Sequence, residues 1–290
     1  KSFARLRPSF FVAVFFVATV LKIDWRIFMP IITKPNCFDA DYFFVCKGNE
    51  ILVKDNSFIS KKEFEFFANE TFSDDWYIEK NLSFAAALAK ENCSAPENCK
   101  FISVRQFCFE HKETAFLASR AASILKQRSA FKFCPSCKGK LIDDETESAR
   151  KCPDCKTKFF PRIEPATITL VSKGEEILLV KNKNSAYKNY ACVSGFVEQG
   201  ETLEQCVARE IKEETNIEVQ RIKYCGSQAW PFPDQLMLAF TAEYKSGEIK
   251  IQESEILEAH WFKRTELPSE SQLPRPGSVA WNLINGIFKS

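Results

Sequence analysis

The chain has 290 residues, of which 45% are hydrophobic and 27% are charged, and its formal net charge at pH 7 is +2. This length and apolar content can support two or three domains with cores of their own. The nearly neutral charge argues against binding to duplex DNA, because that interaction needs a strongly basic surface.

The first residues resemble a targeting segment. Three basic residues within the first seven precede an uncharged, mostly apolar run from Ser9 to Leu21. That run is too short for a comfortable membrane span but suits the apolar region of a signal peptide. Because Met29 is the only early methionine, we expect residues 1–28 to be an upstream translation artefact or an organelle leader, and we expect no stable membrane partner.

The next part of the chain is expected to form an N-terminal α+β domain over residues 29–130. Apolar and β-branched residues predict strands near 42–60. The spacing of apolar residues predicts helices near 80–92 and 113–128.

Two cysteine pairs follow, Cys134-Pro-Ser-Cys137 and Cys152-Pro-Asp-Cys155. Two such knuckles can supply four thiolates to a tetrahedral Zn²⁺, so residues 131–161 are predicted to be a zinc ribbon. The ion has no open position in a four-cysteine site, which indicates a structural role. Disulfides are the alternative, but twelve cysteines in an otherwise ordinary chain suit a reducing compartment. We therefore expect a cytoplasmic protein, with mitochondria or peroxisomes as alternatives.

Residues 162–290 are expected to form a mixed domain that contains both helices and strands. Its predicted elements are strands over 166–172, 176–182, 236–244 and 258–263, a helix that begins near residue 203, and a closing helix over 277–288.

The predicted helix near residue 203 has two start signals and one apolar face. The hydroxyl of Thr202 can cap the first turn, and Gln205 can return the hydrogen bond from three residues further on. Leu203, Val207 and Ile211 recur every four residues. They therefore form one side of the helix, which should face a core.

Three carboxylates, from Glu210, Glu213 and Glu214, share a stripe of the same helix. Like charges at these spacings repel and raise each other's pKa, so they require a compensating cation. Mg²⁺ or Mn²⁺ suits them, because these hard ions prefer oxygen ligands and also bind phosphate oxygens. Arg209 is expected to orient the loop carboxylate of Glu201.

A solvated acidic helix surface is the alternative, since most charge runs are exposed. The loop before the helix favours the functional interpretation. Gly195 and Gly200 are two of only nine glycines, and they bracket a turn that must bring backbone close to a ligand. At the other end of the helix, Asn216 can adopt the left-handed conformation that ends a helix.

A third pattern lies in the segment from Gly226 to Met237. Pro231 and Pro233 flank Phe232, and Trp230 precedes them. This stiff segment can present aromatic rings for stacking on a flat heterocycle. A loop that packs its rings on the core is the alternative.

The string Gly195–Ile217 has the spacing G-x5-E-x7-R-E-U-x-E-E-x-x-U, which is the Nudix box, with Asn216 in place of the usual Gly. A zinc ribbon, this box and a SQxWPFP segment, in that order, resemble the NADH pyrophosphatase family of Nudix hydrolases over about 103–280. In the third motif the chain departs from the family at Ala229 and Gln235. The resemblance implies an α/β/α sandwich around a mixed sheet, and a homodimer.

The resemblance also implies site residues. The catalytic metal ligands would be Glu210, Glu213, Glu214, Glu255 and the backbone carbonyl of Ser194, with Glu213 as ligand or general base. Phe160 and Trp230 would enclose the nicotinamide. The other substrate contacts would be Gln228, Ala229, Pro231, Phe232, Pro233, Asp234, Gln235, the backbone of Ala280, and the basic side chains Arg105 and Lys54.

The expected reaction is metal-dependent hydrolysis of the pyrophosphate of NADH or a related dinucleotide, giving reduced nicotinamide mononucleotide and AMP. Removal of NAD caps from RNA 5′ ends is a further activity of the family. Two alternatives stay open: a Nudix enzyme for another substrate, such as ADP-ribose or a nucleoside triphosphate, and a non-catalytic zinc-ribbon protein that binds nucleic acid. Crowded carboxylates argue against the second alternative, because a protein without catalysis has no need for them.

Overall fold

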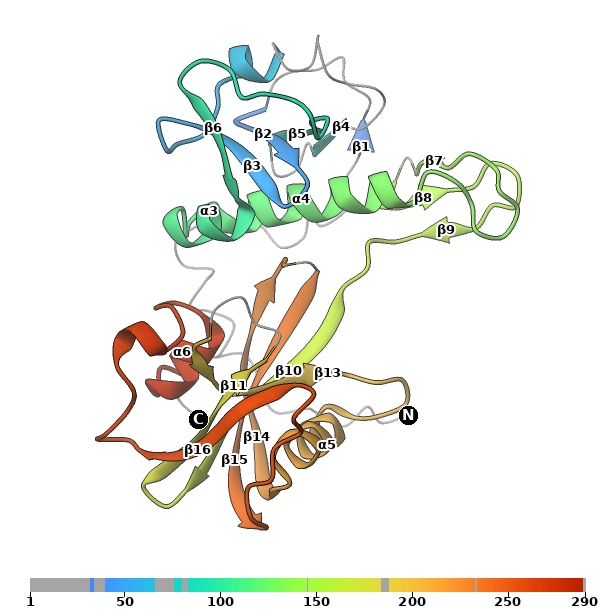
Figure 1. Ribbon diagram of the computed structural model, residues 1–290. Helices are drawn as coiled ribbons and strands as arrows, with labels where there is room; N and C mark the ends of the chain where they lie inside the picture. The colour runs from blue at the N-terminus through green and yellow to red at the C-terminus, as the bar shows by residue number, and fades with distance from the viewer. Residues whose placement is uncertain are drawn as a thin grey trace, which may run out of the picture.

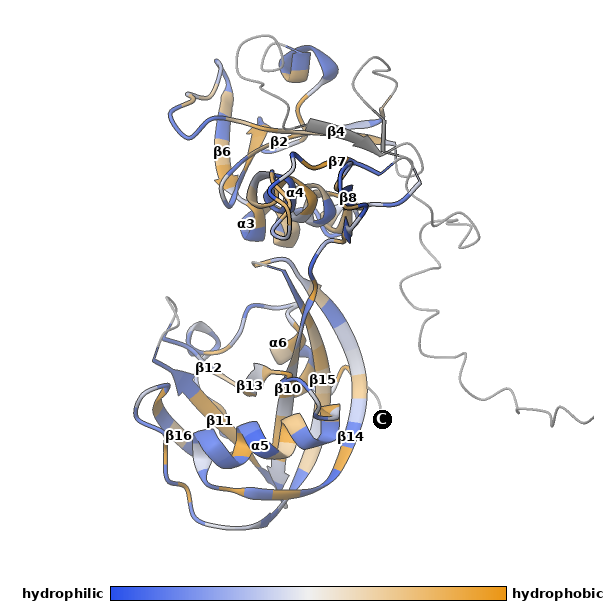
Figure 2. Cartoon of the chain, turned by 90° about the vertical axis from the view of Figure 1, so that its right-hand side faces the viewer, coloured by the Kyte–Doolittle hydropathy of each residue, from blue (hydrophilic) through white to orange (hydrophobic). Residues whose placement is uncertain are grey.

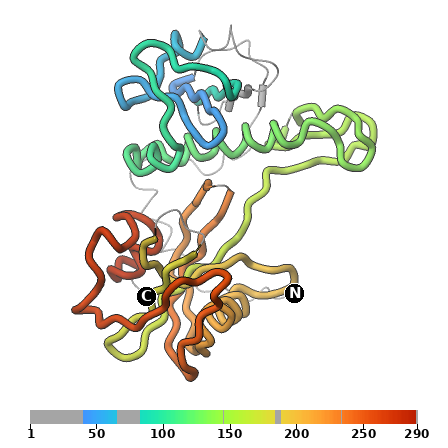
Figure 3. The backbone as a smooth tube through the Cα atoms, viewed as in Figure 1, coloured from blue at the N-terminus to red at the C-terminus, as the bar shows by residue number. Residues whose placement is uncertain are grey.

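The computed structural model describes residues 32–33, 40–65, 76–79, 83–144, 146–183, 188–232 and 234–288. The expected leader, residues 1–28, and Pro233 lie outside this part of the chain. Within the described residues, three sheets follow one another along the sequence, and Figure 3 traces the path from one to the next. No helix in these ranges is long and apolar enough to cross a membrane.

The first sheet has six strands and carries two helices on one face (Figure 1). In spatial order its strands are β1 (Ile32–Thr33), β4 (Trp76–Glu79), β5 (Phe84–Leu88), β2 (Tyr42–Lys47), β3 (Glu50–Lys54) and β6 (Cys99–Ser103). The helices are α3 (Val104–Glu110) and α4 (Ala115–Ala130). They pack on the sheet through buried residues such as Phe107 and Leu125, which share a core cluster with Phe44. The expected strands near 42–60 and the helix near 113–128 are confirmed.

The prediction of a helix near 80–92 is wrong, because residues 84–88 form the strand β5. This strand lies between β4 and β2, and three of its alanines are fully buried. Ala86 joins the core beneath α3 and α4, whereas Ala85 and Ala87 join the core on the other face. The helix propensity of alanine is worth only fractions of a kcal/mol per residue, about 0.5, so burial between two strands overrides it.

The cysteine segment forms a small ribbon beyond the end of α4 (Figure 1). Its strands are β7 (Ile142–Asp143), β8 (Arg150–Lys151) and β9 (Lys158–Phe159), which pair antiparallel. Arg128 of α4 is buried and donates to the carboxylate of Asp143 at 2.6 Å. Gln127 of α4 donates to the carbonyl of Phe159 at 3.3 Å. These contacts attach the ribbon to the helix.

The third sheet has seven strands and is mixed, because β10 and β15 run parallel while its other strand pairs are antiparallel. Its strands are β10 (Glu164–Lys173), β11 (Glu176–Asn182), β12 (Tyr190–Ala191), β13 (Val193–Phe196), β14 (Glu218–Trp230), β15 (Gln235–Ser246) and β16 (Ile256–Lys263). Two helices, α5 (Leu203–Thr215) and α6 (Val279–Ile284), and a 3-10 turn (Glu270–Gln272) complete this part.

The two helices cover opposite faces of this sheet. Successive residues of a strand point to opposite faces, and in β10 Leu170 packs in the core of α6 while Val171 packs in the core of α5. The buried face of α5 is formed by Val207 and Ile211, and Figure 2 shows hydrophobic and hydrophilic residues along this helix. The expected α/β/α sandwich is confirmed.

The sequence pattern did not reveal β14, whose last residue is Trp230. Its end pairs with β15 from Gln228↔Met237 to Trp230↔Gln235. The ladder shifts register at several points, and Gly226, Ser227 and Gln228 have weak strand propensity. Pairing along the long partner strand outweighs that propensity.

Candidate active site

Helix α5 begins directly after Thr202 and ends directly before Asn216, the two residues expected to cap it. The amide of Gln205 donates to the hydroxyl of Thr202 at 3.3 Å, and the amide of Thr202 donates to the side chain of Gln205 at 2.8 Å. At the other end Asn216 has a φ of 61°. The predicted capping box and left-handed end are both confirmed, so the register of the acidic residues on the helix is fixed.

Arg209 ties the loop before α5 to the helix. Its guanidinium donates to both oxygens of Glu201, at 3.0 and 2.5 Å, and to the carbonyl of Phe196 at 2.9 Å. The hydrogen bonds from Arg209 lower the pKa of Glu201 to about 2. Glu201 also accepts from the amide of Glu198 at 2.7 Å. The predicted pairing of Arg209 with Glu201 is confirmed, and it holds the loop in one conformation.

Arg209 also reaches the acidic stripe. Its Nη1 donates to Glu210 at 2.8 Å and to Glu213 at 3.1 Å. The side chain of Glu213 is 54% exposed, whereas that of Glu210 is largely buried. The two carboxylates therefore differ in solvation although one cation touches both.

Glu214 is the most buried carboxylate of the stripe, with 3% of its surface exposed. Its Oε2 has no hydrogen-bond partner among the described residues. Burial raises the pKa of Glu214 to about 8, and the charges of Glu210, Glu255 and Glu213 add to this effect. Burial likewise raises the pKa of Glu210. A buried carboxylate with one oxygen left without a partner, beside three other carboxylates, is costly without a cation, so this donor set fits divalent metal ions.

Gly195 lets β13 pass directly over the acidic stripe. A Cβ at this position would overlap the carboxylate of Glu210. Only glycine allows the backbone and the carboxylate to approach this closely. The spacing of the box thus reflects a contact between strand and helix.

A cavity of about 490 Å³ opens over these groups. It brings together six of the predicted residues: Ser194, Glu210, Glu213, Glu214, Gln235 and Glu255. Several further residues line it that the sequence motifs did not indicate, namely Ala166, Asn182, Phe196, Glu198, Met237 and Gln252. Most of these come from separate strands and loops, and no spacing in the sequence relates them to the box. Phe196 and Glu198 were the exceptions, because they lie inside the box.

The remaining predicted substrate contacts lie outside the cavity lining. Gln228 accepts from the amide of Val279 at 2.7 Å and donates to the carbonyl of Gly277 at 3.0 Å. It therefore holds the start of α6, where Ala280 is buried. Lys54 lies on β3 of the first sheet and pairs with Glu63 at 2.7 Å.

Among the predicted aromatic contacts, Phe160 is exposed, whereas Trp230 and Phe232 pack against other side chains. Phe160 follows the ribbon and is 54% exposed. Trp230 lies beside Arg105, whose guanidinium is 5.1 Å from the ring centroid, and Phe232 packs on the core of the first sheet. The alternative interpretation, in which the loop packs its rings on a core, therefore holds for Phe232. Of the other residues in this segment, Ala229 is exposed, and Pro231 and Asp234 are half-buried.

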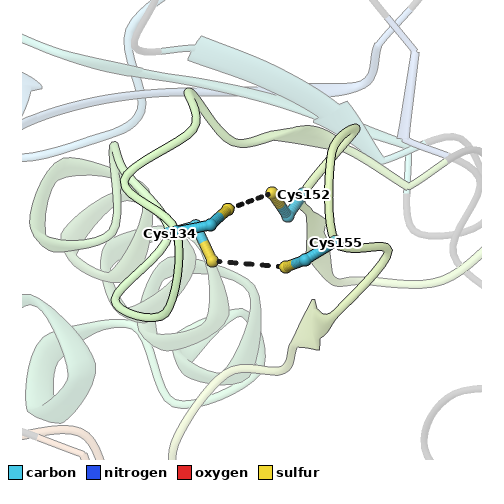
Figure 4. Close-up of side chains that lie close together, drawn as sticks. Cys134, Cys152 and Cys155 are labelled. Carbon is cyan, nitrogen blue, oxygen red and sulfur yellow. Dashed lines mark hydrogen bonds between the residues drawn. The ribbon is translucent and has the colours of Figure 1, made fainter.

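The four ribbon cysteines lie close together. Figure 4 shows three of them, Cys134, Cys152 and Cys155, with their sulfurs turned toward the same space. All four sulfurs lie within 4.8 Å of each other, with the closest pairs at 3.3 and 3.6 Å. A disulfide would bring two sulfurs to about 2.05 Å, so these thiols are not bridged. Sulfurs around a tetrahedral zinc are about 3.8 Å apart, as follows from a Zn–S distance of about 2.3 Å. Cys134, Cys137, Cys152 and Cys155 therefore fit a tetrahedral metal site.

Comparisons with known proteins agree with this geometry. The NUDIX domain family matches residues 162–281. The NAD-capped RNA hydrolase NudC of Pectobacterium carotovorum is 41% identical over 182 residues, which cover 63% of this chain and 69% of that protein. The protein of the same name from Vibrio atlanticus is 34% identical over 248 residues, which cover 85% and 89%. That from Chromobacterium violaceum is 44% identical over 167 residues, which cover 58% and 62%.

Proposed function

Because this chain belongs to the NADH pyrophosphatase family of Nudix hydrolases, we propose that it hydrolyses the pyrophosphate of NADH and related dinucleotides to reduced nicotinamide mononucleotide and AMP. We further propose that it removes NAD caps from RNA. Its relatives are named for that activity, and the same bond is cleaved in both reactions.

The observation that carries this proposal is the buried carboxylate of Glu214, whose Oε2 has no hydrogen-bond partner in the described part of the chain, among three further carboxylates in one cavity. Glu210, Glu213, Glu214, Glu255 and the carbonyl of Ser194 would hold Mg²⁺ or Mn²⁺. Such ions screen the negative phosphates and lower the pKa of an attacking water.

The protein's own groups have separable roles. Glu213 is the most exposed carboxylate of the stripe, so it is suited to accept a proton from water while its neighbours hold metal. Arg209 fixes the side chains of Glu210 and Glu213, and Glu201 fixes Arg209. This arrangement keeps the reacting groups in place before the substrate arrives.

The dinucleotide would bind between aromatic rings. Trp230 and the exposed ring of Phe160 would stack on the nicotinamide end, and Arg105 would contact a phosphate or ribose. Gln228, Ala229, Pro231, Pro233, Asp234, Gln235, Ala280 and Lys54 complete the proposed contacts, whereas the ring of Phe232 packs on the first sheet.

The chain would also have three domains and one structural metal ion. The ribbon would hold one structural Zn²⁺ through its four cysteines. Residues 29–130, 131–161 and 162–290 would be the N-terminal, ribbon and Nudix domains. The protein would act as a cytoplasmic homodimer.

The test is hydrolysis of NADH, ADP-ribose and NAD-capped RNA by the purified chain with Mg²⁺ or Mn²⁺, followed by chromatography of the products. Glu214→Gln is expected to lower turnover by about 100-fold or more, because metal stabilisation contributes several kcal/mol and each tenfold corresponds to about 1.36 kcal/mol.

Glu204→Gln is the matched control, because Glu204 is an exposed residue of the first turn of the same helix. This variant should retain the wild-type rate. Absence of mononucleotide products from every dinucleotide would overturn the proposed function, and preferential cleavage of ADP-ribose would reassign the substrate.

A further inference from the structure

The tip of the β14–β15 hairpin lies against the two helices of the first sheet (Figure 1). Phe232 packs on the core cluster that α3 and α4 form with that sheet. Two residues further on, the carboxylate of Asp234 accepts from the ammonium of Lys126 on α4 at 2.8 Å. Residues far apart in the sequence therefore hold one short segment.

The same tip is tied to the sheet that contains the cavity. The amide of Phe232 donates to the carbonyl of Trp230 at 2.7 Å, which closes a tight turn. The carbonyl of Asp234 accepts from the amide of Glu164 at 2.9 Å, at the start of β10. The next residue, Gln235, lines the cavity. A displacement of Asp234 would therefore be transmitted directly to a cavity residue.

The aromatic end of the tip is held by α3. Trp230 meets the ring of Phe109 edge to face, at 6.1 Å between centroids, and lies under the guanidinium of Arg105. Arg275, from the loop before α6, lies 5.9 Å above the ring of Phe109. The contacts on α3 thus restrain Trp230, and those on α4 restrain Asp234.

We propose that α3 and α4 act as a clamp that positions Trp230, Phe232, Asp234 and Gln235 for the dinucleotide, with Lys126 as a positioning residue that acts through Asp234. This proposal rests on the proposed function for its substrate. Lys126 lies outside the cavity lining, and its effect on the substrate is exerted through the segment that it holds.

The clamp can be tested without substrate by hydrogen–deuterium exchange of the full chain. Lys126→Met removes the charge and keeps a good helix former on an exposed position of α4. The amides of Phe232, Asp234 and Gln235 should exchange faster in this variant, and Lys126→Arg should restore wild-type exchange. Lys263→Met removes the exposed ion pair with Glu266, which lies outside the clamp, and should leave these amides unchanged. Equal exchange in Lys126→Met and wild type would overturn the clamp.

Steady-state kinetics with NADH test its consequence. Lys126→Met should raise KM by about two- to fivefold, the range expected for one partly exposed ion pair, and keep kcat within about twofold. Lys126→Arg should recover the wild-type KM. A fall in kcat at unchanged KM would overturn the positioning role. If the wild-type chain cleaves no dinucleotide, the proposed function fails, whereas the exchange measurement still decides whether the clamp exists.

Discussion

Glu214 is a residue at which stability and ligand binding oppose each other. Its carboxyl is buried beside three other carboxylates, and its pKa is raised to about 8 from an ordinary value of 4.5. The folded, metal-free chain therefore favours the protonated carboxyl, whereas a divalent ion needs the carboxylate.

The sign of the resulting pH dependence follows from proton binding. Below pH 4.5 the carboxyl is protonated in both the folded and the unfolded chain, and its contribution to stability is fully present. Between pH 4.5 and about 8 the unfolded chain releases this proton while the folded chain retains it, so stability falls and then levels off above pH 8.

We therefore predict that metal-free protein is less stable at pH 8 than at about pH 5.5, by on the order of a few kcal/mol from this group. Glu214→Gln should reduce this difference, because its amide does not titrate, and Glu204→Gln should retain it. Urea unfolding in the presence of a chelator measures both. Identical pH profiles for the two variants would show that Glu214 does not titrate as described.

The residues of the site could be predicted only in part from the sequence. Glu210, Glu213 and Glu214 lie within one helical turn of each other, so local spacing was enough to place them on one stripe. Asn182 and Gln252 reach the same cavity from distant positions, and nothing local to them indicates where the strands bring them. Residue type alone could not identify these amides.

At the scale of elements, the stability of α5 depends on its two capping residues. Thr202→Ala removes the hydroxyl that accepts from Gln205 and should cost about 1 kcal/mol. Both Asn216→Ala and Asn216→Gly lose the hydrogen bond from Nδ2 of Asn216 to the carbonyl of Glu248, but only alanine is strained in the left-handed region. Asn216→Ala should therefore be less stable than Asn216→Gly by about 1 kcal/mol.

Urea unfolding at constant pH measures these differences, with Thr202→Ser as the variant that retains the cap. If Asn216→Ala proved as stable as Asn216→Gly, the left-handed end of α5 would have to be reconsidered.

The elements were predictable to the extent that their signals were local. Helix α5 has caps and a regular apolar face, and its limits followed from them. The alanine run of β5 and the weak strand formers at the end of β14 acquire their conformation from neighbouring strands. In both cases pairing with neighbouring strands outweighs intrinsic propensity. A single sequence does not show that pairing.

At the scale of the whole molecule, the four-cysteine ribbon contacts α4 of the first sheet and leads directly into β10 of the third. We predict that Cys137→Ser abolishes binding of one zinc ion per chain and lowers Tm, because metal binding supplies the folding energy of such ribbons. Exchange of amides in residues 133–160 should rise, while α5 should stay protected.

Metal analysis together with thermal unfolding checks this prediction. Cys93→Ser changes a partly exposed cysteine outside the ribbon and should alter neither result. Zinc retained at one ion per chain in Cys137→Ser would contradict the four-cysteine site.

The overall architecture was more predictable than the contacts between its parts. The cysteine pairs and the box are short motifs with characteristic spacings, and the third sheet and its two helices followed from them by resemblance. The packing of Phe232 on the first sheet could not be predicted from the sequence, because an aromatic residue between prolines suits an exposed loop and a packed one equally well.

The parallel pair β10–β15 also has a consequence for synthesis. Everything from β11 to β14 must be made before β10 meets this partner, and α6 follows later still. Contacts so distant along the chain form slowly. While the polypeptide is still attached to the ribosome, Ile168 and Leu170 of β10 lack the cover that α6 gives them in the finished fold. These apolar side chains therefore stay uncovered until α6 has been made, and the incomplete chain is prone to aggregate in that interval.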